Sequence, residues 1–172
     1  TLLEAVLVMG ILILIVSLTL PAMLSAIQAT RLTSAGELIS GKLVEAQGLA
    51  LTFSSDVELR VYKSPLHESG DGSSGQSLQI FQMVENNVVP ETTEGQASLA
   101  RLIPMGDPEP LPAGVGISTH VEFSSLWNLP AQEEKTHDGS REYVAIRFRP
   151  DGSTDLTEAQ AWHLTLIEYP VI

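Results

Sequence analysis

The residues best suited to catalysis or metal binding are four histidines, and the chain has no cysteine. The histidines His67, His120, His137 and His163 are widely separated and show neither the i, i+4 pairing nor the HExxH pattern of a metal site. The stretch HDGS at 137–140 holds the residue types of a Ser-His-Asp triad side by side. Triads are assembled in space from separate segments, however, and this stretch has the composition of a turn. We therefore expect no catalytic residue and no metal site built on histidine.

Acidic side chains in the predicted loops are the other candidate ligands, because carboxylate oxygens bind calcium. They are Asp71, Asp107, Glu109, Asp138, Asp151 and Asp155. None of them matches the spacing of an EF-hand, so solvated loop acids are the favoured interpretation. No glycine-rich motif follows a strand and opens a helix, which disfavours a nucleotide site. The sequence thus indicates a protein that is not an enzyme and that needs no metal or other cofactor.

Charge and hydrophobicity are segregated along the chain. The net charge is −12 and the pI is about 4.6, whereas the mean hydropathy is +0.16. The acidic net charge and the positive mean hydropathy are compatible because they come from different parts of the chain. No charged residue occurs from Ala5 to Ile27, and every acidic residue except Glu4 lies at Glu37 or beyond. An acidic domain that lacks Lys/Arg clusters interleaved with aromatic residues repels phosphate backbones. Nucleic acid is therefore excluded as an expected partner.

The uncharged run from Ala5 to Ile27 is 23 residues long. As a helix that rises about 1.5 Å per residue it would span roughly 34 Å, which matches a bilayer core. It is longer than the apolar core of a secretory signal peptide, and no small-residue cleavage site follows it. We therefore expect a helix that crosses a membrane.

Glu4 stands directly against this apolar run, and a carboxylate in that place has two interpretations. It is either a first-turn acid that the helix dipole favours and that stays in water at the membrane edge, or it enters an apolar bundle and pairs with the free α-amino group of a neighbouring chain. At about 4 Å and an effective dielectric near 20 such a pair attracts by roughly 4 kcal/mol, much of which desolvation cancels. In that case Glu4 would set the register between chains more than it would stabilise them.

Thr1-Leu2-Leu3-Glu4, followed by an unbroken apolar helix, resembles the start of a type IV pilin or pseudopilin after removal of its leader peptide. The family pattern is an aromatic residue followed by Thr-Leu-x-Glu. The resemblance implies that Glu4 is the assembly carboxylate, with Thr1 at the same site. Pro21 falls where many of these helices carry a proline, which removes one backbone hydrogen bond and kinks or locally opens the helix. The implied packing residues of the filament core are Leu2, Leu3, Val6, Leu7, Ile11, Leu14, Ile15 and Leu18.

Beyond the apolar run the helical period continues to about residue 53, now with its apolar residues on one side. From Asp56 the period changes to two, which predicts strands in DVELRVYK, SLQIFQMV, VGISTHVEF, EYVAIRFR and WHLTLIEY. We expect an α+β fold in which a single long N-terminal helix, apolar in its first half, packs by its second half on a C-terminal antiparallel β-domain. The expected domains are a membrane or filament-core helix at 1–54 and an exported β-rich domain at 55–172.

The turns and loops complete the expected β-domain. Gly, Pro and acidic clusters predict loops at 67–76, 89–96, 104–114 and 129–140. The turn PDG at 150–152 predicts that EYVAIRFR and the last strand pair as an antiparallel hairpin.

The stretch FRPDGSTDL with the apolar strand after it resembles the C-terminal part of H-type minor pseudopilins and FimT proteins, and cassette-encoded pilin-like proteins have a similar layout. The resemblance implies a structural subunit of an extracellular or periplasmic filament, held in the inner membrane before assembly and packed among copies of itself afterwards. It also implies a prepilin peptidase and a pilus assembly machinery as partners. Two alternatives stay open: a monomeric, membrane-tethered β-domain that binds a ligand, and a minor pseudopilin of a secretion system.

Overall fold

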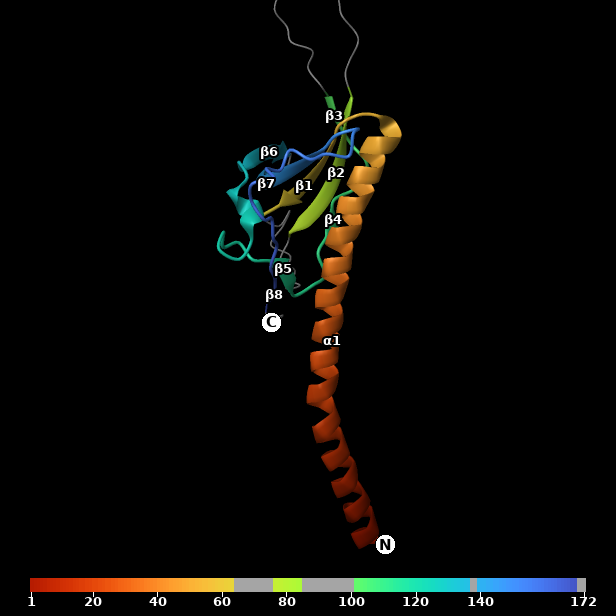
Figure 1. Ribbon diagram of the computed structural model, residues 1–172. Coiled ribbons are helices and arrows are strands. Elements are labelled where there is room, and N and C mark those ends of the chain that lie inside the picture. Colours follow the sequence, from red (N-terminus) through yellow and green to blue (C-terminus); the bar gives the residue numbers. More distant parts are fainter. Residues whose placement is uncertain (64–75, 85–100, 137–138, 170–172) are drawn as a thin grey trace, which may run out of the picture.

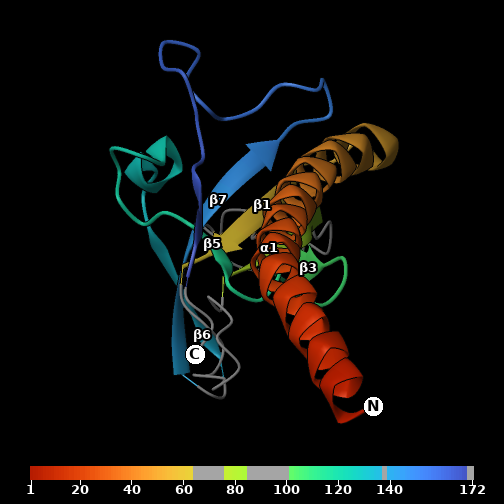
Figure 2. The same ribbon diagram turned by 90° about the horizontal axis from the view of Figure 1, so that it is seen from below.

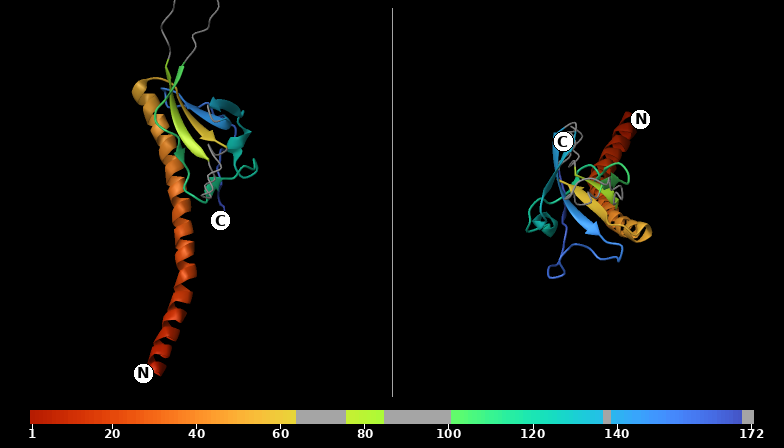
Figure 3. Two further views of the ribbon diagram at one scale, coloured as in Figure 1. Left: turned by 180° about the vertical axis from the view of Figure 1, so that it is seen from behind. Right: turned by 90° about the horizontal axis from the view of Figure 1, so that it is seen from above.

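The computed structural model describes residues 1–63, 76–84, 101–136 and 139–169, except for the side chains of 18–22, 24, 136 and 139. Its helical residues, labelled α1, run from Leu2 to Phe53. A β-domain lies beside the C-terminal part of α1, and the N-terminal part projects beyond the domain, so that the N-terminus is far from the sheet (Figure 1). The view from behind shows the same separation (Figure 3, left).

The expectation of a single long N-terminal helix is wrong. The helical residues form two segments, 2–17 and 25–53, and the first segment is short and exposed. The axis changes direction between them (Figure 1). The physical reason lies in the connecting residues, where Pro21 has no backbone N–H to donate to the carbonyl oxygen one turn earlier.

The second segment, 25–53, is the part of α1 that packs on the β-domain. Its buried residues recur at helical spacing and are small or branched: Ala35, Ile39, Ala46 and Ala50. Small side chains on this side let the helix backbone approach the sheet closely. The helix ends at Phe53 because the next residue, Ser54, adopts a left-handed conformation with φ of 49°.

The main sheet is antiparallel in every described pairing and has the strand order β3-β2-β1-β7-β6, with β4 also paired to β2. It curls around the end of α1, which covers one of its faces (Figure 2). The strands are β1 (Val57–Tyr62), β2 (Ser77–Val84), β3 (Arg101–Pro104), β4 (Glu109–Pro110), β6 (Gln132–Thr136) and β7 (Gly139–Phe148).

The hydrophobic core lies between α1 and the inner face of this sheet. Alternate residues of β1 provide its centre, and Leu59 is paired with Ile80 on one side and Ile146 on the other. All three side chains are at most 5% exposed. Burying each aliphatic side chain of this size stabilises the fold by about 1.5–3 kcal/mol. The period-two pattern of DVELRVYK thus has its expected consequence on the inner face.

A second, two-stranded sheet closes the lower end of the domain. It pairs β5 (Val115–Ile117) with β8 (Leu166–Glu168) in antiparallel register, and the 3-10 helix η1 (Ser125–Asn128) packs nearby. The predicted hairpin between EYVAIRFR and the last strand is therefore wrong. The turn at 149–152 is present, with the Gly152 N–H donating to the Arg149 carbonyl oxygen at 2.9 Å. The chain after that turn leaves β7, however, and reaches β5 instead.

Two of the predicted loops also contain strands. β4 and the last residue of β3 lie within the predicted loop 104–114, and β6 lies within the predicted loop 129–140. The sequence QEEKT of β6 has no apolar alternation because this strand forms an edge of the sheet with exposed side chains. The predicted loop 89–96 and most of the loop 67–76 lie outside the described residues.

Candidate assembly surface

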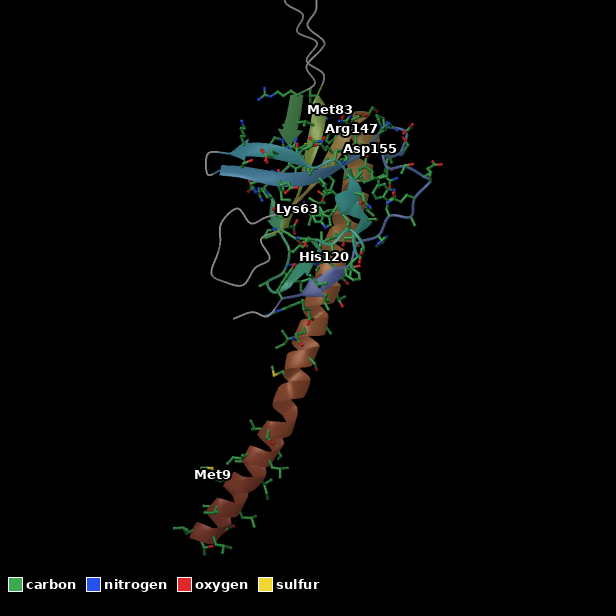
Figure 4. All side chains as sticks on the ribbon, turned by 90° about the vertical axis from the view of Figure 1, so that its left-hand side faces the viewer. Met9, Lys63, Met83, His120, Arg147 and Asp155 are labelled. Atoms are coloured by element: carbon green, nitrogen blue, oxygen red, sulfur yellow. The ribbon has the colours of Figure 1, made fainter. Side chains whose placement is uncertain are left out.

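The most unusual surface of the molecule is the N-terminal helical segment, 2–17. Twelve large apolar side chains of this segment are at least 49% exposed. Figure 4 shows the side chains around Met9 pointing into solvent, away from the β-domain. The seven predicted core residues that can be located all belong to this set: Leu2 84%, Leu3 77%, Val6 63%, Leu7 58%, Ile11 52%, Leu14 60% and Ile15 51% exposed.

The exposed apolar residues cover every side of the segment. The six consecutive residues from Ile11 to Val16 are all large, apolar and at least half exposed, and consecutive residues of a helix point in successive directions about 100° apart. A helix that is apolar all round is normally buried, in a large core or in a membrane. The segment therefore has no polar side that could stay in water while the opposite side packs.

Glu4 is the only charged side chain of this segment. Its Oε2 lies 3.2 Å from the nitrogen of Thr1, and both side chains are exposed, at 76% and 88%. An exposed pair of this kind contributes at most about 1 kcal/mol. The pairing of Glu4 with the amine of a neighbouring chain stays a prediction.

Two of the residues predicted for assembly, Leu18 and Pro21, lie just after this segment. Their side chains lie outside the described residues. Within the part of the chain that the structure describes, no helix is long and apolar enough to cross a membrane.

Sequence reasoning missed a second cluster, on the outer face of the main sheet. Glu58, Arg60 and Tyr62 alternate along β1 opposite the core residues, and each is at most 6% exposed. Arg60 lies between two aromatic rings, 4.1 Å from the centroid of Phe81 and 4.3 Å from that of Tyr143. The alternation in DVELRVYK places these residues on one face, but nothing local indicates that the face is covered.

Glu134 of β6 links the members of this outer-face cluster. It accepts hydrogen bonds from Arg60 Nη1 at 2.9 Å and from the Tyr62 hydroxyl at 2.7 Å. Arg60 Nε also donates to Glu58 at 2.7 Å. The guanidinium of Arg141 stacks 3.9 Å from the centroid of the Tyr62 ring. The cluster thus joins β1, β7 and β6 through paired charges and stacked rings, which is a stabilising arrangement.

The pKa values in the outer-face cluster shift as this burial requires. Burial and the hydrogen bond to Glu134 raise the pKa of Tyr62 well above its ordinary value. Burial alone would lower the pKa of Arg60, but the hydrogen bond and charge of Glu58 outweigh it, so this pKa is raised. Burial lowers the pKa of Arg141. The shifts of Tyr62 and Arg60 move both groups further from neutral pH, where a group can exchange protons in a reaction.

The histidines and acids considered as ligands are scattered. His120 is exposed in a turn beside Phe123, whereas His163 bonds through its backbone to Ser125. Asp151 accepts hydrogen bonds from the Ser153 hydroxyl and N–H, which lower its pKa, and Asp155 accepts one from the N–H of Arg147. The described ranges hold no group of three or more residues suited to a metal ion. His67, Asp71, His137 and Asp138 lie outside the described residues.

Comparison with protein-family models, with curated proteins and with solved structures finds no match to this chain.

Proposed function

We propose that this protein is a structural subunit of an extracellular or periplasmic filament of the type IV pilus or pseudopilus kind. It assembles by packing segment 2–17 among copies of the same segment, with the β-domain outside. Before assembly the segment is held in the inner membrane, and a prepilin peptidase and an assembly machinery act on the subunit. The protein is not an enzyme, and nucleic acid is not among its partners.

The observation that carries this proposal is the all-round apolar exposure of segment 2–17. Burying a large apolar side chain stabilises by about 1.5–3 kcal/mol, so the six most exposed of the twelve would contribute on the order of 10 kcal/mol. That value is comparable with the cost of association, which is about 4–15 kcal/mol. Burying only half of the twelve side chains would therefore leave little net stabilisation, which favours a bundle of several helices over a single neighbour.

The sequence before Glu4 and the position of this residue support the same proposal. A carboxylate that enters an apolar bundle needs a charged partner, and when another chain supplies this partner the pair fixes the register between subunits. A membrane anchor without assembly has no use for such a residue. Glu4 is therefore the residue whose change separates a filament subunit from the tethered binding module.

The test is electron microscopy of filaments sheared from cells that express Glu4→Ala, with mass spectrometry to identify the subunit. We expect this variant to form no filaments while its β-domain stays folded, as judged by protease resistance. Glu122→Ala removes an exposed acid of the β-domain and should leave filaments normal. Abundant filaments from Glu4→Ala would contradict the proposal, and wild-type protein found only as a membrane-held monomer would favour the tethered module.

A further inference from the structure

The first 36 residues contain only two charged side chains, and these have opposite signs: Glu4 and Arg31. Glu4 lies at the start of the exposed segment 2–17, and Arg31 lies in the second segment, 25–53. All other residues of this stretch are apolar, small or uncharged polar. Whatever covers the stretch in an assembly must therefore accommodate these two side-chain charges, besides the Thr1 nitrogen that already contacts Glu4.

Arg31 has no carboxylate partner among the described residues, although it is half-buried. Lys42, the only other basic residue of α1, does have carboxylate partners: it pairs with Glu45 at 2.9 Å and with Glu109 at 3.0 Å. Glu4 likewise uses only Oε2, in its contact with Thr1, and no contact of Oε1 is found in the described chain. Each of the two charges thus retains unused hydrogen-bonding capacity.

Packing the apolar segments together would take both charges out of water. An uncompensated charge in such a place is strongly destabilising, whereas a hydrogen-bonded pair of opposite charges is tolerated. A guanidinium is the best match for a carboxylate because its planar fork can donate two parallel hydrogen bonds. The two charges cannot meet within one molecule, because they lie on separate helical segments of α1, 27 residues apart, or roughly 40 Å at the rise of a helix.

We propose, resting on the filament function above, that Glu4 of one copy forms an ion pair with Arg31 of a second copy. Parallel helices must then be staggered by 27 residues, or about 40 Å. Each copy therefore binds one neighbour through Glu4 and another through Arg31. Such a head-to-tail contact does not close on itself, and it generates an open filament.

Charge reversal in the full-length protein tests this pairing. Glu4→Arg and Arg31→Glu should each lower the yield of sheared filaments about tenfold or more, and the double variant should recover most of the loss, as a coupled pair does. The matched control combines Glu4→Arg with Lys42→Glu, which reverses a helix cation that already has partners in its own chain, and it should give no recovery. A Glu4→Arg/Arg31→Glu yield no better than the single variants would overturn the pairing.

Disulfide cross-linking tests the stagger separately, because the chain has no cysteine of its own. Val8 and Ser34 are both exposed, and each lies one helical turn after its charged residue. Assembled Val8→Cys/Ser34→Cys filaments should give a ladder of covalent multimers on oxidation. Val8→Cys/Gly41→Cys, with the second cysteine about 10 Å further along the same side, should give much less. Equal ladders, or none from intact filaments, would overturn the stagger.

These outcomes are separate from the failure of the filament function itself. If wild-type protein forms filaments that Glu4→Ala abolishes, while every Arg31 variant assembles normally, the function stands and the Glu4–Arg31 pair is wrong. If wild-type protein forms no filaments, the function fails first.

Discussion

At the scale of single residues, the outer face of the main sheet holds a charged and aromatic cluster whose β1 members, Glu58, Arg60 and Tyr62, are as buried as the core. Tyr62 is fully buried, and its hydroxyl donates to Glu134 at 2.7 Å and lies 3.2 Å from an oxygen of Gln79. Removing one partner of such a bond leaves a charged acceptor without its donor, which costs more than the bond itself contributes. The contribution of this cluster to stability therefore depends on every member being present.

We predict that Tyr62→Phe lowers the free energy of unfolding by about 1–3 kcal/mol, because Glu134 loses a buried donor. Denaturant titration of the detergent-solubilised protein measures this value. Tyr143→Phe is the matched control, since its hydroxyl donates to the neutral amide oxygen of Gln132, and it should cost less. An equal loss from the two variants would contradict the special role of the Tyr62 hydroxyl.

The same variant has a defined dependence on pH. The folded state raises the pKa of Tyr62 above its ordinary value of 10.0, so the un-ionised hydroxyl is favoured on folding. Its stabilisation is complete below pH 10 and is lost as the pH rises above that value, because the unfolded chain ionises first. Wild-type protein should thus lose stability above pH 10 more steeply than Tyr62→Phe.

At the scale of elements, α1 combines two helical segments with different surroundings. Segment 25–53 is amphipathic and packs on the sheet through alanines that are fully buried, such as Ala46 and Ala50. Its opposite side carries Gly41 and Gly48, where an added Cβ would meet nothing within 4 Å. The small residues on these two sides therefore have different roles, and only those on the sheet side determine how closely helix and sheet approach.

Substitutions on the two sides of this segment should have opposite effects on stability. Ala46→Leu overfills the helix–sheet contact and should destabilise the β-domain by about 1–3 kcal/mol. Gly41→Ala adds a methyl group in open space and should stabilise the monomer by about 0.5–1 kcal/mol through its higher helix propensity. Thermal unfolding of the two variants under one set of conditions measures both signs. A stabilising Ala46→Leu would mean that the helix–sheet contact has room for a larger side chain.

At the scale of the whole molecule, an apolar end and an acidic domain are kept apart. The range 55–172 has 18 acidic and seven basic residues, and Arg60, Lys63 and Arg147 already pair with acids of the same domain. Filaments that display this domain outside would have strongly negative surfaces. Neighbouring filaments would therefore repel one another at neutral pH and low ionic strength.

We predict that filaments stay dispersed in dilute buffer at pH 7 and form bundles in Mg²⁺ on the order of 10 mM, where divalent ions neutralise the acidic surfaces. Light scattering and negative-stain microscopy measure the bundling. NaCl at the same ionic strength is the control and should bundle the filaments less. Bundling in dilute buffer without divalent ions would contradict this prediction, because attraction between the filament surfaces would then exceed the repulsion of their net charge.

Features that depend on neighbouring residues could be predicted from the sequence. The apolar run with Glu4 at its start, the one-sided helical period that ends at Phe53, and the turn at 149–152 are all patterns of local spacing. The division of the helical residues into two segments was not predicted, although Pro21 marks the position. A proline indicates a local break, but it does not indicate how the segments on its two sides are covered.

Only the tertiary structure decided which strands pair and which faces are buried. β7 pairs with β1, more than 80 residues earlier, and not with the strand that follows it. β6 was predicted as a loop because its residues are polar, yet it supplies Glu134 to the outer-face cluster. Pairing between distant strands depends on the fit of whole faces, which no local window contains. The sequence by itself therefore determined the apolar surface from which the function is proposed, while the tertiary contacts determined the β-domain that this surface carries.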